Sequence, residues 1–305
     1  MVNLETRVGN LVLKNPLILA SGTCGYGEIY KDFYPPRRLG AIVSKGISLK
    51  PREGNPPPRI CEISCGMLNS IGLENVGVEK FVSEKLPWLK KNGVCAVVNI
   101  FGEKQEEYFE LAAGLDREQG IAALELNLSC PNVEKGGLEF GRDAKTVESI
   151  TAGVKAKTRL PVWVKLSASR CDPVELARAA ESAGADAVVV INTLKGMAID
   201  LDQKRPSLAG LTGGLSGPAL KPVALAAVFE TVNAVKVPVV ACGGVFSGKD
   251  ALEFLLVGAS AVQVGTGCLV NPLAPVEILQ EMKNYLGRQK VKSVEQWTGT
   301  IELNR

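Results

Sequence analysis

Two side chains in this sequence stand where they could perform chemistry, a cysteine thiol and a lysine amine. Cys130 lies in the segment LNLSCPN, where Pro131 ends an apolar run. An accessible thiolate on the resulting turn can act as a general base. Lys165 lies inside the apolar run VWVKLSA. Its amine could form a Schiff base, or remain charged and stabilise negative charge on a cofactor ring.

Composition narrows the classes of function. The sequence of 305 residues contains no histidine, so pairs of a nucleophile with histidine, histidine bases and histidine metal ligands are excluded. We expect no metal site. The formal charge of +3 and the absence of a basic run argue against nucleic-acid binding. No apolar run reaches the ~18 residues of a membrane span. The eight scattered cysteines predict a reduced, cytoplasmic protein, and seven of them are expected to be small buried apolar side chains.

Short apolar runs rich in Val, Ile and Leu recur along the chain. They mostly lack alternation with polar residues, which is typical of strands buried on both faces of a parallel sheet. The predicted strands are 16–22, 41–48, 95–102, 123–132, 161–168, 187–193, 238–245 and 261–267.

Amphipathic stretches separate these runs and predict helices. Asp172 and Ser247 are expected as N-caps, and Gly184 and Gly258 as the ends of the same two helices. Eight strands that alternate with helices predict an α/β fold. In a chain of this length they favour a (β/α)₈ TIM barrel over a doubly wound open sheet. We expect the barrel to form a single domain over residues 1–305. The predicted helices are 77–92, 103–118, 143–158, 172–183, 218–235, 247–257 and 274–286.

Two connections, 49–76 and 194–216, are too long for simple loops after a strand and are expected to be active-site loops at the C-terminal face of the barrel. Polar side chains also gather at the carboxyl ends of six predicted strands, which suggests one shared ligand because buried polar groups need partners. These residues are Ser21, Lys45, Asn99, Asn127, Lys165, Asn192 and Thr193.

The last two predicted strands end in glycines, at Gly243-Gly244 and at Gly265-Thr266-Gly267. Glycines there let backbone N–H groups approach a phosphate, at the common phosphate position of such barrels. The segment NSIGLEN (69–75) offers an amide side chain and backbone N–H groups around Gly72, which suits a planar, amide-rich or anionic ligand.

These motifs together resemble the class 1 dihydroorotate dehydrogenases over about residues 4–287. The resemblance rests on EGNPPPR (53–59), NSIGL (69–73), ELNLSCPN (125–132), VKLS (164–167), INT (191–193), GGLSGPALKPVAL (213–225), GG (243–244) and VGTG (264–267). It implies a (β/α)₈ barrel that binds FMN and oxidises (S)-dihydroorotate to orotate in pyrimidine biosynthesis.

Carried over to this sequence, the resemblance implies specific roles. Cys130 would be the base that removes a proton from carbon 5 of the substrate, and Lys165 would balance negative charge on the flavin. FMN would be bound by Ser21, Lys45, Gly46, Asn99, Asn127, Lys165, Ile191, Gly217, Gly243, Gly244, Gly265 and Thr266. Dihydroorotate would be bound by Lys45, Asn69, Ser70, Ile71, Gly72, Leu73, Asn127, Asn132, Asn192 and Thr193.

The segments CPNVEKGGLEFGRD and INTLKGMAIDLDQKRPSLAG resemble class 1B, the NAD-dependent type. This implies a partner subunit that carries FAD and an iron–sulfur cluster, around a homodimeric core within a heterotetramer. Three alternatives remain open: a class 1A enzyme that uses fumarate, a lyase that forms a Schiff base on Lys165, and a barrel that binds a phosphate ligand without catalysis.

Overall fold

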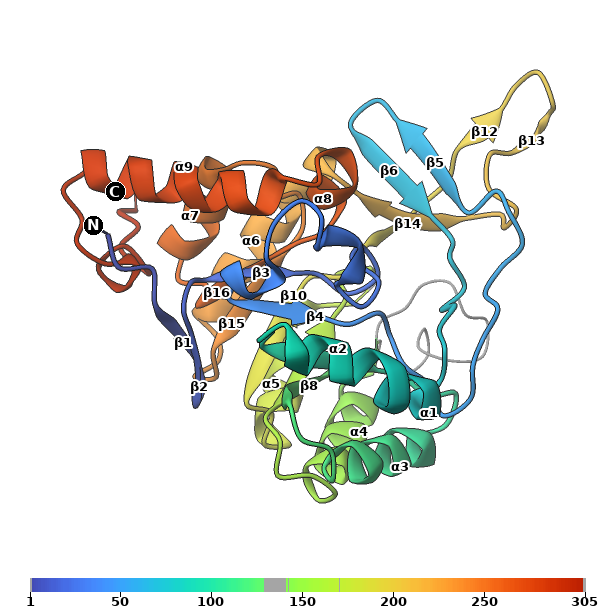
Figure 1. Ribbon diagram of the computed structural model, residues 1–305. Coiled ribbons are helices and arrows are strands. Elements are labelled where there is room, and N and C mark those ends of the chain that lie inside the picture. Colours follow the sequence, from blue (N-terminus) through green and yellow to red (C-terminus); the bar gives the residue numbers. More distant parts are fainter. Residues whose placement is uncertain (1, 129–140, 142, 170, 304–305) are drawn as a thin grey trace.

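The computed structural model describes residues 2–128, 141, 143–169 and 171–303. Each of the eight predicted apolar runs supplies one parallel strand, and the strands close into a barrel in the order β10-β15-β16-β3-β4-β7-β8-β9, which confirms the predicted TIM barrel (Figure 1). The strands are β3 (Leu17–Leu19), β4 (Ala41–Val43), β7 (Ala96–Ile100), β8 (Ile121–Asn127), β9 (Val162–Leu166), β10 (Ala187–Val190), β15 (Val239–Cys242) and β16 (Ala261–Val264).

The barrel interior changes from apolar to polar along its axis. Successive side chains of a strand point to opposite faces, so residues two apart share the interior. Trp163 is fully buried in the apolar lower part of the barrel, and Lys165 lies two residues further along β9. The same alternation on β7, β8 and β16 brings Asn99, Glu125 and Gln263 to the level of Lys165. The upper barrel therefore carries a buried polar layer.

A hairpin that the sequence analysis did not predict closes the lower end of the barrel. Its strands are β1 (Thr6–Val8) and β2 (Leu11–Leu13), paired antiparallel around a turn at Gly9. Val8 and Leu13 are buried against the lower barrel core. This plug leaves the opposite, carboxyl end of the strands as the open end of the barrel.

The predicted helices surround the barrel. Asp172 accepts a hydrogen bond from Val174 N at 2.8 Å, and Ser247 forms a capping box with Asp250, as expected from the sequence. Short 3₁₀ helices, Glu28–Tyr30 and Pro36–Arg38, take the place of a helix between β3 and β4. The α-helices are α1 (Val78–Lys80), α2 (Leu86–Lys91), α3 (Gln105–Leu115), α4 (Ala144–Lys155), α5 (Pro173–Ser182), α6 (Lys221–Val232), α7 (Gly248–Leu256), α8 (Thr266–Val270) and α9 (Ala274–Arg288).

The predicted helix 77–92 is interrupted by a π-helical segment, Phe81–Lys85, between α1 and α2. Pro87 lies two residues after this segment and lacks the N–H that an α-helix needs, and in a regular α-helix its ring would clash with the carbonyl four residues earlier. A wider turn relieves that clash, which accounts for the interruption.

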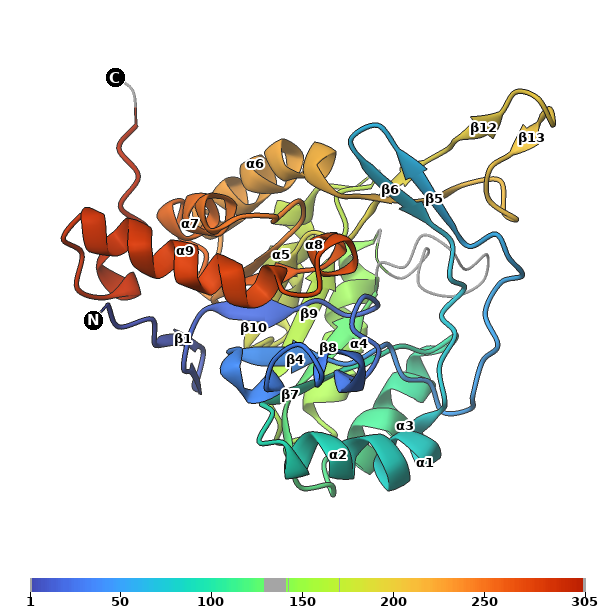
Figure 2. The same cartoon turned by 45° about the horizontal axis from the view of Figure 1, so that its top comes forward.

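The two long connections form one small antiparallel sheet at the open end of the barrel (Figure 2). Its order is β11-β14-β6-β5, and β6 pairs with β14 across 145 residues of sequence, with Asn69 opposite Gly214. A second hairpin, β12 (Ile199–Asp200) with β13 (Arg205–Pro206), projects beyond it. The sheet strands are β5 (Ile60–Ile63), β6 (Gly66–Asn69), β11 (Leu194–Gly196) and β14 (Gly213–Ser216).

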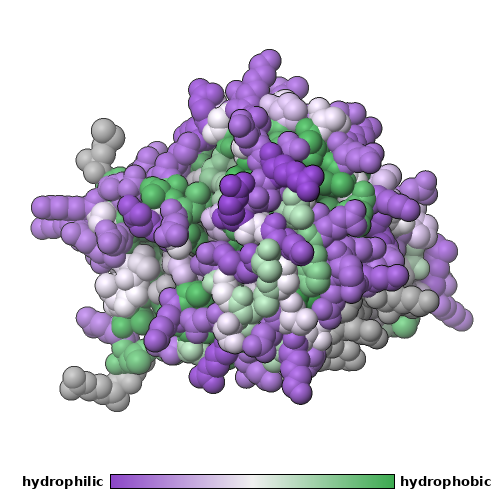
Figure 3. Space-filling view, turned by 90° about the horizontal axis from the view of Figure 1, so that it is seen from below, coloured by the Kyte–Doolittle hydropathy of each residue, from purple (hydrophilic) through white to green (hydrophobic). Residues whose placement is uncertain are grey.

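The face shown in Figure 3 is hydrophilic over most of its area, with separate apolar side chains between the polar ones. Among the residues described, no helix has the length and apolar character that a membrane crossing requires.

Candidate functional site

A cavity of about 280 Å³ opens at the carboxyl ends of the barrel strands. All eight barrel strands, or the loops that follow them directly, contribute to its wall, and the small sheet adds residues such as Met67 and Ser216. Binding sites of (β/α)₈ barrels lie at this end. The cavity is therefore the candidate functional site.

Most of the predicted site residues come together in this cavity. Ser70 is an exception, because its buried hydroxyl accepts a hydrogen bond from Asn55 Nδ2 at 2.9 Å while its neighbours Asn69 and Ile71 line the cavity. Cys130 and Asn132 lie outside the described residues. The predicted residues that line the cavity are Ser21, Lys45, Gly46, Asn69, Ile71, Gly72, Leu73, Asn99, Asn127, Lys165, Ile191, Asn192, Thr193, Gly217, Gly243, Gly244, Gly265 and Thr266.

Five of the cavity glycines have positive φ angles, which favour glycine. They are Gly22, Gly72, Gly217, Gly243 and Gly244, with φ angles of 84°, 75°, 104°, 136° and 73°. A Cβ at Gly244 would also lie 2.5 Å from Lys221 N, at the start of α6. The chain thus turns sharply after β15 and passes close to the first turn of a helix, which leaves backbone rather than side chains at this part of the wall.

Two amide oxygens in the cavity wall are buried without a partner. Asn99 Oδ1 and Asn127 Oδ1 accept no hydrogen bond from any residue that the structure describes. A buried acceptor without a donor costs free energy, on the order of 1–3 kcal/mol. Because both residues line the cavity, a ligand that offers N–H or O–H groups would satisfy them.

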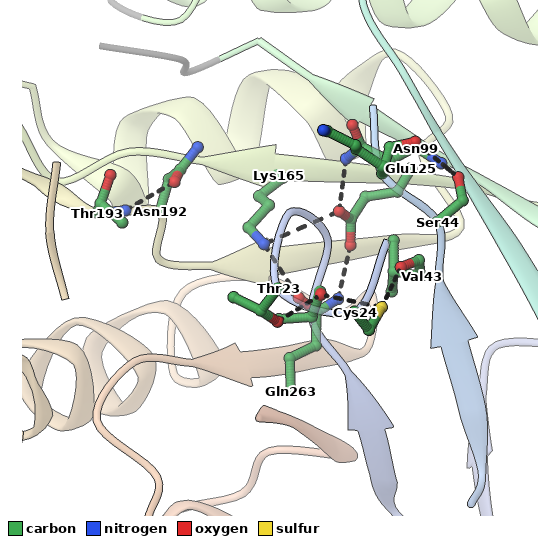
Figure 4. Close-up of polar contacts among 12 residues, drawn as sticks. Thr23, Cys24, Val43, Ser44, Asn99, Glu125, Lys165, Asn192, Thr193 and Gln263 are labelled. Carbon is green, nitrogen blue, oxygen red and sulfur yellow. Dashed lines mark hydrogen bonds and ion pairs between the residues drawn. The ribbon is translucent and has the colours of Figure 1, made fainter. Parts of the chain in front are cut away.

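Below the cavity, a carboxylate that the sequence analysis did not single out organises the polar layer (Figure 4). Glu125 is fully buried and accepts hydrogen bonds from Asn99 Nδ2 at 2.7 Å and from Gln263 Nε2 at 2.6 Å. Lys165 Nζ donates to Gln263 Oε1 at 3.0 Å and lies 3.9 Å from Glu125 Oε1. The signal for it in the sequence was a carboxylate in an otherwise apolar run, two residues before Asn127.

The electrostatic surroundings keep the Lys165 amine charged. Burial alone would lower the pKa of Lys165, but Cys242 and Glu125 outweigh burial and hold that pKa above its usual range. Burial also raises the pKa of the Cys242 thiol. The Glu125 carboxylate lies 3.9 Å from Lys165 Nζ and forms an ion pair with it. The floor of the cavity therefore presents one buried ammonium group.

A second charged cluster lies in the wall beside the small sheet. Lys45 Nζ is 3.2 Å from Glu74 Oε2, and Arg59 Nη1 donates to the same oxygen at 2.8 Å. Arg59 also donates to the backbone carbonyl of Glu53, which ties the segment before β5 to this cluster. Glu74 was not predicted as a site residue, although it directly follows the NSIGL motif.

The arrangement can bind a planar polar ligand over a buried cation, with amides around its edge and glycine backbone near an anionic tail. Among the described residues, no group of three or more Cys, Asp or Glu side chains is placed to hold a metal ion.

Comparison with known proteins agrees with this geometry. A family profile described as "Dihydroorotate dehydrogenase" matches residues 3–286. The "Dihydroorotate dehydrogenase B (NAD(+)), catalytic subunit" of Trichlorobacter lovleyi is 50% identical over 299 residues, 98% of each chain. The protein of the same name from Desulforamulus reducens is 50% identical over 302 residues, 99% of each chain.

A solved structure supports the fold. The dihydroorotate dehydrogenase of Eimeria tenella, crystallised with ferulenol, superposes with a TM-score of 0.80 at 23% identity, over 98% of this chain and 88% of that one. At that level of identity the likeness bears on the barrel alone. The family profile and the near-full-length relatives together show that this chain belongs to the dihydroorotate dehydrogenase family.

Proposed function

We propose that this chain is the catalytic subunit of an NAD-dependent dihydroorotate dehydrogenase, which oxidises (S)-dihydroorotate to orotate in pyrimidine biosynthesis. One observation carries the proposal beyond family membership: the predicted cofactor residues that the structure describes converge on one cavity above a buried ammonium group. The relatives at about 50% identity carry the same activity in their names. We take residues 1–305 as one FMN-binding barrel domain.

The cavity fits FMN in three respects. Lys165 supplies a buried positive charge for the isoalloxazine ring. Asn99 Oδ1 and Asn127 Oδ1 are acceptors to which no described residue donates. The backbone at Gly243, Gly244 and the neighbouring loop after β16 can approach the phosphate. The remaining proposed FMN contacts are Ser21, Lys45, Gly46, Ile191, Gly217, Gly265 and Thr266.

The proposed substrate residues surround the same cavity from two sides. Asn69, Ile71, Gly72 and Leu73 come from the small sheet and its following loop, while Asn127, Asn192 and Thr193 come from the barrel. Amides there would hold the edges of the pyrimidine ring, and Lys45 would face the substrate carboxylate. Ser70 would act through the backbone only, because its side chain bonds to Asn55. Asn132 completes the proposed set.

The proposed reaction separates proton and hydride removal. Cys130, as a thiolate, takes the proton from carbon 5 of dihydroorotate, which becomes a thiol proton. The chemistry that FMN supplies when bound is acceptance of the hydride from carbon 6. The new carbon–carbon double bond completes orotate. The protein orients the substrate and the cofactor, and Lys165 would balance negative charge on the flavin.

The charged state of Lys165 argues against the alternative of a Schiff-base lyase. An amine must be unprotonated to attack a carbonyl, so Schiff-base lysines have lowered pKa values. The pKa of Lys165 is instead raised, because Cys242 and Glu125 outweigh the effect of burial. A protonated amine at this position suits electrostatic stabilisation.

Electrons would leave this chain through a partner subunit that carries FAD and an iron–sulfur cluster, around a homodimeric core within a heterotetramer. The name "catalytic subunit" of the relatives supports a separate partner. The sequence contains no GxGxxG segment after a strand to hold a dinucleotide, and no cysteine cluster for an iron–sulfur relay. The small sheet beside the cavity would also restrict access of a nicotinamide to a flavin below it.

This proposal predicts a specific pattern of electron acceptors. The isolated, FMN-loaded chain should reduce artificial dyes with dihydroorotate, and it should not reduce NAD. Addition of the partner subunit should restore NADH formation, followed at the absorbance of NADH, in proportion to the complex formed.

Assays with fumarate distinguish the family alternative. Rapid turnover of the isolated chain with fumarate, unaffected by the partner, would assign it to class 1A instead. Failure to reduce any dye with dihydroorotate, in a protein that holds FMN, would refute the proposed substrate.

A further inference from the structure

Glu125 is the buried acid that the proposed chemistry does not use. It has no solvent exposure and lies on β8, within the polar layer between the cavity and the apolar lower barrel. It does not line the cavity, so it is not in a position to touch a ligand there. A buried carboxylate is costly unless its partners require it. We therefore expect the role of Glu125 to lie in how it orients and charges the side chains that contact it.

The first partner is the Asn99 amide. Asn99 Nδ2 donates to Glu125 Oε1 at 2.7 Å, and an amide has its donor and acceptor on opposite sides. A carboxylate can only accept, so it holds the nitrogen of Asn99 toward itself and turns Oδ1 away. Oδ1 is one of the two buried amide oxygens in the cavity wall that accept no hydrogen bond from the described residues. A Cβ at Gly46 would lie 2.9 Å from Oδ1, so the glycine keeps space beside this oxygen.

The second partner is Gln263, which links Glu125 to Lys165. Gln263 Nε2 donates to Glu125 Oε2 at 2.6 Å, so its other end, Oε1, is left to accept from Lys165 Nζ at 3.0 Å. A glutamine in place of Glu125 would fix neither amide, since its own amide could donate as well as accept. One carboxylate thus sets the direction of two amides and the position of one amine.

Charge is the third effect of Glu125. The titratable groups that face Lys165 are Glu125 from β8, Cys242 from β15 and Cys24 from the loop after β3. Burial raises the pKa of both thiols, that of Cys24 to about 12. Of these three groups, Glu125 accepts hydrogen bonds from two amide N–H groups and forms an ion pair with Lys165 Nζ at 3.9 Å. Without it, desolvation would favour loss of the Lys165 proton.

We propose that Glu125 is a positioning residue for the cofactor: it turns the Asn99 oxygen toward the cavity and holds the Lys165 amine at the cavity floor through Gln263 and an ion pair. The inference rests on the proposed function in that FMN is the ligand. Glu125, which does not contact the ligand, would then determine where the cavity floor presents a hydrogen-bond acceptor, Asn99 Oδ1, and where it presents a cation, Lys165.

The test is FMN binding to the apoprotein, measured by quenching of flavin fluorescence at pH 7 and pH 9. Glu125→Gln keeps size and shape but can donate to Asn99 Oδ1, which would reverse that amide. We expect the Kd for FMN to rise roughly tenfold at pH 7. The ratio of variant to wild-type Kd should rise further at pH 9, because loss of the Glu125 charge lowers the pKa of Lys165 and burial favours the uncharged amine.

Two further variants separate this role from a merely structural one. Thr231→Val removes a buried hydroxyl on α6 that bonds to Ala227 O, remote from the cavity, and should leave the Kd at the wild-type value at both pH values. Glu125→Asp keeps the charge but shortens its reach. It should weaken FMN binding by a factor that is the same at pH 7 and pH 9.

A Kd for Glu125→Gln within twofold of wild type, or raised equally at both pH values, would overturn the inference. If Glu125→Gln does not fold, Glu125→Asp decides: wild-type affinity, or a loss that grows with pH, would overturn it. If wild type and Thr231→Val bind no FMN, the proposed function fails instead.

Discussion

Replacement of Cys130 by alanine is expected to leave FMN bound and to slow its reduction by dihydroorotate by about 10²–10⁴-fold, the usual contribution of a general base. The reason is that no thiolate remains to take the proton from carbon 5 when the hydride leaves carbon 6. Stopped-flow measurement of the loss of flavin absorbance, without oxygen, isolates this half of the reaction.

Other cysteine variants sharpen this prediction. Cys130→Ser should be intermediate at best and should regain rate at high pH, because a hydroxyl is harder to ionise than a thiol. Cys65→Ser provides the matched control, since Cys65 is exposed at the turn between β5 and β6. A reduction rate of Cys130→Ala equal to that of wild type would refute the role of Cys130.

Replacement of Lys165 by methionine is expected to lower the free energy of unfolding of the apoprotein by about 3–5 kcal/mol, the range for removing one partner of a buried ion pair. Lys165 Nζ lies 3.9 Å from a Glu125 carboxylate that has no exposure to solvent, so that carboxylate would lose its counter-charge. Urea unfolding at pH 7 measures the difference.

The double variant Lys165→Met/Glu125→Gln removes both charges and should recover most of the lost stability. The raised pKa of Lys165 sets the pH range: its stabilisation is complete below the unfolded-state pKa of about 10.4 and is lost as pH rises through the higher folded-state pKa. Lys85→Met breaks the partly exposed pair with Glu28 and should cost about 1 kcal/mol or less. An equally small effect of Lys165→Met would contradict a buried ion pair.

The barrel could be predicted because its strands are encoded locally. Runs such as 95–102 and 187–193 are apolar apart from polar residues near their carboxyl ends, and each supplies a strand that is buried on both faces. Their polar ends point to the same cavity because parallel strands share their carboxyl edge. Asn99, Lys165 and Asn192 could therefore be assigned to one site before their distances were known.

Features that depend on pairing between distant segments could not be predicted in this way. The strand β6 pairs with β14, more than 140 residues later, and neither Gly66–Asn69 nor Gly213–Ser216 has a strong strand pattern of its own. The two long loops were expected near the active site, but their common sheet was not. The plug of β1 and β2 was missed for a similar reason, because strands of three residues carry little periodicity.

The position of Glu125 in the polar layer can be predicted from the sequence once the strand register is known. Strand pairing sets Asn99 opposite Glu125 and Asn127 opposite Lys165. Since side chains alternate along each strand, an acid, an amide and a lysine at these positions must meet inside the barrel. Without the register, the sequence does not distinguish Glu125 from other carboxylates, and in the motif ELNLSCPN the chemistry was assigned to Asn127, Cys130 and Asn132.

Anaerobic titration of the purified, FMN-loaded chain with (S)-dihydroorotate tests whether the chain oxidises this substrate with FMN as the acceptor. We expect a yellow protein whose flavin absorbance bleaches with about one equivalent of dihydroorotate per FMN, as orotate appears in equal amount. A colourless protein that cannot be reconstituted with FMN, or a bound flavin that keeps its absorbance in excess dihydroorotate, would contradict it.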